Sequence, residues 1–123
     1  RDLPALMKAY ALQKKAAKVG FDWPEIGPEL DKVDEELREL REAVAAGKDK
    51  ETQALELGDL LFAAVNVARF IGADPEEALA RTNVKFARRF AHIEERLRES
   101  GKTFGQTNLE EMDQWWEEAK RKY

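Results

Sequence analysis

Cysteine is absent from this chain of 123 residues, and histidine and serine occur only once each, at His92 and Ser100. Without cysteine there are no disulfides and no thiolate metal ligands, which favours a reducing, cytoplasmic setting. One serine and one histidine leave little material for a nucleophilic triad. Arg89 stands three residues before His92, so the Glu-x-x-His motif of di-iron helical bundles is missing as well.

Long apolar runs and an excess of positive charge are also lacking. No run of about 18 apolar residues is free of charges, and no signal-peptide pattern is present, so we expect no membrane partner. The net charge of −4 gives no support for nucleic-acid binding. A glycine-rich phosphate loop is missing too, so side-chain cations or metal ions would have to hold an anionic substrate. The length indicates one domain over residues 1–123, and a start at Arg1 rather than Met is compatible with a piece of a longer protein.

Helical patterns cover most of the chain, and no segment has a convincing strand pattern. Pro4 suits a first helical turn, Asp74 with Pro75 forms a start signal, and Asn108 is a good N-cap. The expected helices run from Pro4 to about Lys18, from near Pro28 to about Ala46, from the GKDK turn (47–50) to Gly72, from Pro75 to about Ser100 and from Asn108 nearly to the end. We therefore expect an all-α fold of about five helices.

The third expected helix is apolar around its whole circumference over residues 54–71. Such a helix has to be packed on all sides, and one short chain would struggle to cover it, so we expect a homodimer or larger assembly. The polar exceptions are Glu56 and Asp59, with Asn66 on the same side and Arg69 near the end. Carboxylates are almost never buried unless they are paired or bound to a cation.

A second acid pair, Glu36 and Glu39 with Glu35 beside it, lies on the preceding helix. Taken alone, an acid pair on a charged helix is usually solvated surface. The short turn between the two helices, however, demands antiparallel packing, which can bring this pair to Glu56 and Asp59. Four carboxylates would supply the oxygen ligands that Mg²⁺ or Mn²⁺ prefers.

The fourth expected helix carries positively charged side chains in two positions, on one flank and farther out. Lys85 and Arg89 are four residues apart on one flank, where they can either bind an anion or form an ordinary basic surface. For Arg88 and Arg81, which are turned farther out, the surface interpretation is preferred. Lys and Arg beside an oxygen-bound metal are the parts that hold a polyphosphate during phosphoryl transfer.

Two aromatic pairs have open roles. Trp115 and Trp116 are adjacent and must face different ways, so one is expected to pack while the other could stack on a base. Phe21 and Trp23 lie in a loop rich in glycine and proline, and for them we favour packing.

Together these motifs resemble the MazG family of all-α nucleoside triphosphate pyrophosphohydrolases. The resemblance rests on EELRE (35–39), ELGD (56–59) and NVKFARR (83–89), and it extends from KAAKVGFDW (15–23) to WEEAK (116–120). It is closest to the C-terminal catalytic domain of two-domain MazG proteins. The acid motifs are shared with dimeric dUTP and phosphoribosyl-ATP pyrophosphohydrolases, whereas the flanking segments are more specific.

The resemblance implies hydrolysis of nucleoside triphosphates to the monophosphate and pyrophosphate, in cytoplasmic house-cleaning of nucleotide pools. It implies a four-helix-bundle type of core completed by dimerisation. The implied Mg²⁺ ligands, of which Glu36 and Glu39 are also the catalytic carboxylates, are Glu36, Glu39, Glu56 and Asp59. The implied contacts to the nucleoside triphosphate are Lys32, Lys85, Arg89, Trp116 and Lys120.

One position departs from the family pattern. Family members often carry a basic residue near the start of the third helix, where this chain has Thr52, so Lys48 or Lys50 would have to replace it. The competing hypothesis is a non-catalytic dimerisation or regulatory module that keeps the fold. The presence of all four acids and of both Lys85 and Arg89 argues against a module that has lost its catalytic activity.

Overall fold

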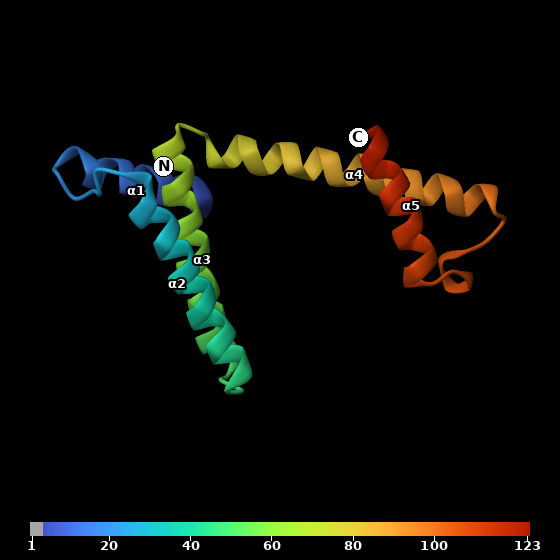
Figure 1. The fold of residues 1–123 in the computed structure, drawn as a ribbon, viewed down its shortest axis with the longest axis horizontal. Coiled ribbons are helices and arrows are strands. Elements are labelled where there is room, and N and C mark those ends of the chain that lie inside the picture. Colours follow the sequence, from blue (N-terminus) through green and yellow to red (C-terminus); the bar gives the residue numbers. More distant parts are fainter. Residues whose placement is uncertain (1–3) are drawn as a thin grey trace. The chain divides into compact units, whose positions relative to one another are not determined.

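The computed structural model describes residues 4–123, and within this range the chain is helical without any strand (Figure 1). The elements are α1 (Ala5–Lys18), α2 (Ile26–Ala45), α3 (Lys50–Ile71), α4 (Pro75–Glu99), the short 3-10 helix η1 (Phe104–Gln106) and α5 (Leu109–Lys122). The prediction of an all-α chain with five α-helices is therefore confirmed. No helix in the described range contains a stretch that is long and apolar enough to cross a lipid bilayer.

The ends of the helices follow local chemistry. The Asp49 carboxylate caps α3 by accepting a hydrogen bond from the Thr52 amide at 2.9 Å, and Gly72 ends the helix with a left-handed φ of 79°. Helix α2 begins at Ile26, two residues before the predicted start near Pro28. A proline is tolerated in the first turn because the amide it lacks would have no acceptor within the helix.

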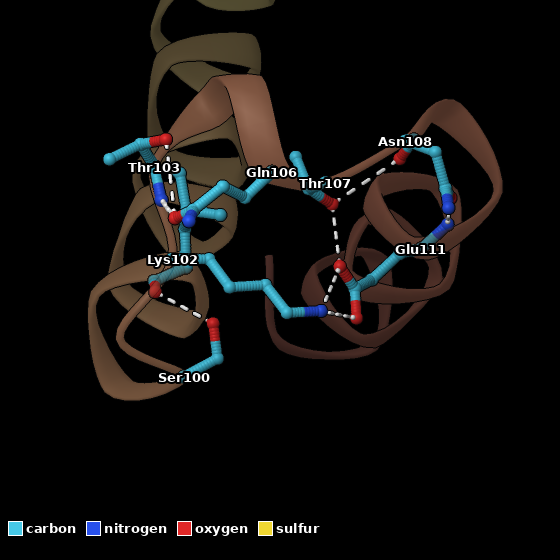
Figure 2. Close-up of polar contacts among 8 residues, drawn as sticks. Ser100, Lys102, Thr103, Gln106, Thr107, Asn108 and Glu111 are labelled. Atoms are coloured by element: carbon cyan, nitrogen blue, oxygen red, sulfur yellow. Dashed lines mark hydrogen bonds and ion pairs between the residues drawn. The ribbon is translucent and has the colours of Figure 1, made fainter.

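No helix is predicted between about Ser100 and Asn108, but this segment contains η1 and is held by side chains (Figure 2). The Thr103 amide donates to Gln106 Oε1 at 2.9 Å. Glu111 accepts from Thr107 Oγ1 at 2.6 Å and from Lys102 Nζ at 3.0 Å, and these two contacts lower the pKa of its carboxyl. Asn108 caps α5 as predicted.

The described chain divides into two compact units, one ending at Ala78 and the other beginning at Leu79. In the first unit, α2 and α3 lie side by side along most of their length (Figure 1), and α1 packs on α3. Only a few side chains are buried in this unit, among them Ala63 and Val65 of α3.

The packing expected around α3 is not supplied within the first unit. Leu61 and Phe62 on α3 are 53% and 47% exposed, and Leu55 and Ile71 are more exposed still. The physical reason is simple: within the first unit, only α1 and α2 are available to cover a helix that is apolar all round. The homodimer that would cover the rest stays a prediction.

The second unit has its own small core. It is formed by Ile93 and Leu97 of α4 and Trp115 of α5, with Phe90, Met112 and Trp116 packed against it. As predicted, the two adjacent tryptophans differ, since Trp115 is buried and Trp116 is half-buried. The packing predicted for the other aromatic pair is wrong, because Phe21 and Trp23 are 83% and 59% exposed.

Candidate functional site

Three carboxylates converge on the side-by-side helices of the first unit. Glu36 comes from α2, while Glu56 and Asp59 come from successive turns of α3. One oxygen atom from each of the three lies within 4.8 Å of the others. The arrangement follows from the sequence, because a spacing of three places Glu56 and Asp59 on one face of α3 and the short turn returns that face to α2.

Glu36 has the most unusual environment of the three. It is only 6% exposed, and its Oε2 is 3.1 Å from Lys32 Nζ. Its other oxygen, Oε1, is buried without a hydrogen-bond partner among residues 4–123. Buried polar atoms are almost always satisfied, so we expect this oxygen to have a partner that the described protein atoms do not provide.

Glu39, the fourth predicted ligand, lies one turn after Glu36 and is not part of the three-residue cluster. It is nevertheless within the electrostatic reach of the cluster. The negative charge of Glu36 is the largest cause of a raised pKa at Glu39, followed by desolvation and by the charges of Glu35 and Glu56. Besides the three clustered acids, Glu39 and Glu35 therefore also belong electrostatically to this region.

Lys32 supplies positive charge next to these acids. Its side chain is half exposed and bridges Glu36 at 3.1 Å and Glu35 at 3.4 Å. The hydrogen bond to Glu36 and the charge of Glu35 raise the pKa of Lys32. The ammonium group of Lys32 therefore lies where it can contact an anion that approaches the acid cluster.

The cluster fits a hard divalent cation. All of its donors are carboxylate oxygens, which Mg²⁺ and Mn²⁺ prefer, and one of its members, Glu36, carries a buried oxygen without a partner in the described range. Three neighbouring carboxylates repel one another unless a cation or a proton offsets their charge.

The other predicted contacts to the nucleoside triphosphate lie in the second unit. The Arg89 guanidinium lies over the ring of Trp116, with 5.6 Å between its central carbon and the ring centroid. Arg89 is half-buried, and its Nε has no hydrogen-bond partner within the described chain. Lys85, one turn earlier on α4, is exposed, and Lys120 on α5 pairs with Glu117 at 3.6 Å. Arg88 is exposed, in agreement with its predicted outward position.

A cavity in the first unit was not predicted. It has a volume of about 400 Å³ and is bounded by α1, the loop after α1, α2 and α3. Its polar residues include Gln13, Glu29 and Asn66. Asn66 was noticed in the sequence, but Glu29 was not; the available signal was its position seven residues before Glu36, which places both acids on nearly the same face of α2.

The sequence matches known proteins over nearly its whole length. Residues 30–94 match the MazG nucleotide pyrophosphohydrolase domain. A nucleoside triphosphate pyrophosphohydrolase of Escherichia coli (strain K12) is 46% identical over 122 residues, which cover 98% of this chain and 46% of that protein. The nucleoside triphosphate pyrophosphohydrolase/pyrophosphatase MazG of Thermotoga maritima is 42% identical over 118 residues, covering 96% of this chain and 45% of that protein. The chain therefore spans less than half the length of these curated relatives.

The matched segment contains the acid cluster as well as the two residues of α4 that are predicted to bind phosphate. Glu36, Glu56 and Asp59 lie within it, and so do Lys85 and Arg89. The resemblance drawn from the sequence motifs is confirmed: this chain belongs to the MazG nucleotide pyrophosphohydrolase domain family.

Proposed function

We propose that this chain hydrolyses nucleoside triphosphates to nucleoside monophosphates and pyrophosphate, in a reaction that depends on Mg²⁺ or Mn²⁺. The observation that carries the proposal is the convergence of Glu36, Glu56 and Asp59, with a buried and unpartnered oxygen on Glu36. The names of the relatives from Escherichia coli and Thermotoga maritima support the type of reaction.

Glu36, Glu56 and Asp59 would hold the divalent cation, with Glu39 as the fourth ligand. When bound, such an ion would offset the negative charge of the phosphate oxygens. The requirement for an ion is supported by the chemistry of the site, since it gathers several carboxylates around one small region.

The side chains of the chain itself have three tasks in this proposal. Glu36 or Glu39 accepts the proton from the attacking water, as a carboxylate general base. Lys32 places an ammonium beside the acids, where the phosphate groups approach. Lys85 and Arg89 bind the triphosphate, which Arg can grip through two parallel hydrogen bonds.

Trp116 and Lys120 contribute to the same nucleotide site. The ring of Trp116 holds the Arg89 guanidinium through a cation–π contact of 5.6 Å. This contact directs Arg89 without using its hydrogen-bond donors, so they stay available for an anion. Lys120, which forms an exposed ion pair with Glu117, adds a further positive charge.

We also propose that the active form is a homodimer that works in cytoplasmic house-cleaning of nucleotides. The large exposed apolar residues of α3, among them Leu61 and Phe62, support the dimer because a second copy would remove them from water. The absence of cysteine supports the compartment.

The decisive experiment measures pyrophosphate release from a panel of nucleoside triphosphates with Mg²⁺ and, separately, with a chelator. We expect release only with Mg²⁺, and we expect Glu36→Gln to abolish it. Glu42→Gln is the matched control, because Glu42 lies on the same helix with its side chain 69% exposed and outside the acid cluster. It should behave like the unmodified chain.

Two results would contradict the proposal. Release that persists in chelator, or that survives Glu36→Gln, would remove the acid cluster from the reaction. A folded chain that dimerises but releases no pyrophosphate from any substrate would favour the non-catalytic module instead.

A further inference from the structure

Three long polar side chains on one flank of α4 contact α5. Arg89, His92 and Arg96 follow spacings of three and four residues, which place them on the same side of the helix. Two of them meet at Glu118 of α5, whose Oε1 accepts from Arg96 Nη1 at 2.5 Å and lies 3.0 Å from His92 Nε2. The Arg96 guanidinium also lies over the ring of Trp115, with 5.8 Å between its central carbon and the ring centroid. Arg96 therefore contacts α5 at two positions, three residues apart.

The contacts of Glu118 are partly shielded from water. The side chain of His92 is 11% exposed, and those of Glu118 and Arg96 are 35% and 38% exposed. Because an ionised carboxylate only accepts hydrogen bonds, His92 Nε2 is the donor in its contact. A single exposed ion pair fixes little, whereas two donors one turn apart that share one carboxylate oxygen restrict its position closely. These contacts therefore specify where on α4 the Glu118 side chain lies.

Glu118 and Trp116 lie on opposite flanks of α5. They are two residues apart, which places their side chains about 160° apart around the helix. The buried Trp115 and Ala119 lie between them. A rotation of α5 about its own axis that moved Trp116 away from α4 would therefore also displace Glu118 from both of its donors.

The position of Arg89 depends in turn on Trp116. Its guanidinium lies 5.6 Å from the centroid of the Trp116 ring, and its Nε is buried without a hydrogen-bond partner within residues 4–123. Phe86 packs against the same ring, with 5.4 Å between the two centroids. An arginine side chain loses much rotamer freedom when it is held in one conformation, so the contact with the Trp116 ring favours the conformation observed.

We propose that Glu118 is a positioning residue of the nucleotide site: held by His92 and Arg96, it fixes the rotation of α5, and thereby keeps the ring of Trp116 over Arg89. This assignment rests on the proposed function, in which Arg89 binds the triphosphate. Glu118 touches neither the substrate nor the metal in this arrangement and acts through Trp116 alone.

The first test is a double-mutant cycle on kcat/KM for pyrophosphate release from one good triphosphate substrate. We expect Glu118→Ala to lower kcat/KM by about threefold or more. Trp116→Leu removes the flat ring but keeps an apolar side chain, and adding Glu118→Ala to it should lower kcat/KM little further. A residue that only stabilises the fold would lower the melting temperature in both backgrounds and give independent effects on kcat/KM.

The matched control is Glu110→Ala. It removes an exposed carboxylate two turns earlier on the same helix, away from the contacts of Glu118. It should leave kcat/KM unchanged. If Glu118→Ala does not fold, Glu118→Gln, which keeps one oxygen acceptor, takes its place in the cycle with a smaller expected loss.

A second measurement needs no activity. The nuclear magnetic resonance signal of the Arg89 Nε–H group, identified by its loss in Arg89→Ala, is shifted by the ring current of Trp116. In the chain without substrate, Glu118→Ala should move this signal toward its position in Trp116→Leu, and Glu110→Ala should leave it in place.

The outcomes separate the positioning role from the proposed reaction. Losses of kcat/KM that multiply independently in the double mutant, or an Arg89 signal that Glu118→Ala leaves in place, would overturn the positioning role and leave the pyrophosphohydrolase proposal intact. A signal that moves as expected, in a chain that releases no pyrophosphate from any substrate, would support the coupling of Glu118 to Arg89 and overturn the proposed function.

Discussion

Asp59→Asn should uncouple the stability of the chain from Mg²⁺. Asp59 is exposed on α3, so an amide of the same size can replace it without disturbing the packing. The substitution removes one of the three carboxylates whose oxygens lie within 4.8 Å of one another. Without metal, the loss of this mutual repulsion should leave the melting temperature unchanged or raise it.

The size of the metal effect follows from mass action. At one hundred times its Kd, an ion that binds only the folded chain adds about 2.7 kcal/mol to the free energy of unfolding. For a chain of 123 residues, each kcal/mol moves the melting temperature by roughly 3–5 °C. Saturating Mg²⁺ should therefore raise the melting temperature of the unmodified chain by about 8–13 °C, and that of Asp59→Asn by much less.

The assay is thermal unfolding followed by circular dichroism over a Mg²⁺ titration, with a chelated sample as reference. Glu42→Gln, which removes a carboxylate outside the cluster, should keep the full shift of the unmodified chain. If Asp59→Asn retains that shift, the acid cluster is not where the ion binds and the ligand assignment is wrong.

Three further predictions concern the phosphate contacts, the assembly and the pH dependence of stability. Arg89→Ala should slow triphosphate turnover by about tenfold or more, the effect of losing charged hydrogen bonds of about 1.5–3 kcal/mol. The exposed Arg88→Ala should do much less, and steady-state kinetics that gave the reverse order would mean that α4 presents another face to the substrate. Leu61→Glu should dissociate or unfold the protein, because it would bury a charge in the proposed dimer; light scattering that finds the unmodified chain to be a stable, active monomer would refute this. The hydrogen bond from His92 and then the contact with Arg96 lower the pKa of Glu118 below its ordinary 4.5. The contribution of the Glu118 carboxylate to the stability of the fold is therefore complete above pH 4.5, and it is lost as the pH falls through the lower, folded-state pKa. Acid unfolding curves for Glu118→Gln should show a smaller loss of stability in that range, and curves parallel to those of the unmodified chain would count against the contact.

Local signals were enough to predict most of the fold. Asp49, Asn108 and Gly72 act within one or two turns of their own positions, so the helix ends that depend on them could be placed from the sequence. The acid cluster could be predicted for a similar reason. The spacing within each acid pair is local, and the turn between α2 and α3 is too short for any other pairing.

Contacts between distant residues could not be predicted in this way. The hydrogen bond between Glu29 and Asn66 joins positions 37 residues apart, and the spacing of seven residues to Glu36 gives the face of α2 on which Glu29 lies but not its partner. The exposure of Phe21 and Trp23 was missed because it depends on which surfaces α1 and α3 leave available to the loop. Sequence periodicity indicates which face is apolar, but it does not indicate what covers that face.

The repeated spacing of seven residues on α2 and α3 also determines where the protein can tolerate changes in length. One residue inserted between Glu29 and Glu36 would rotate one carboxylate by about 100° relative to the other, so that they no longer share a face. An insertion between Asp59 and Asn66 would do the same on α3. An insertion in the turn at 46–49 leaves both spacings intact. Insertions and deletions among related sequences should therefore occur in the turn between α2 and α3 and be absent from these two stretches of helix.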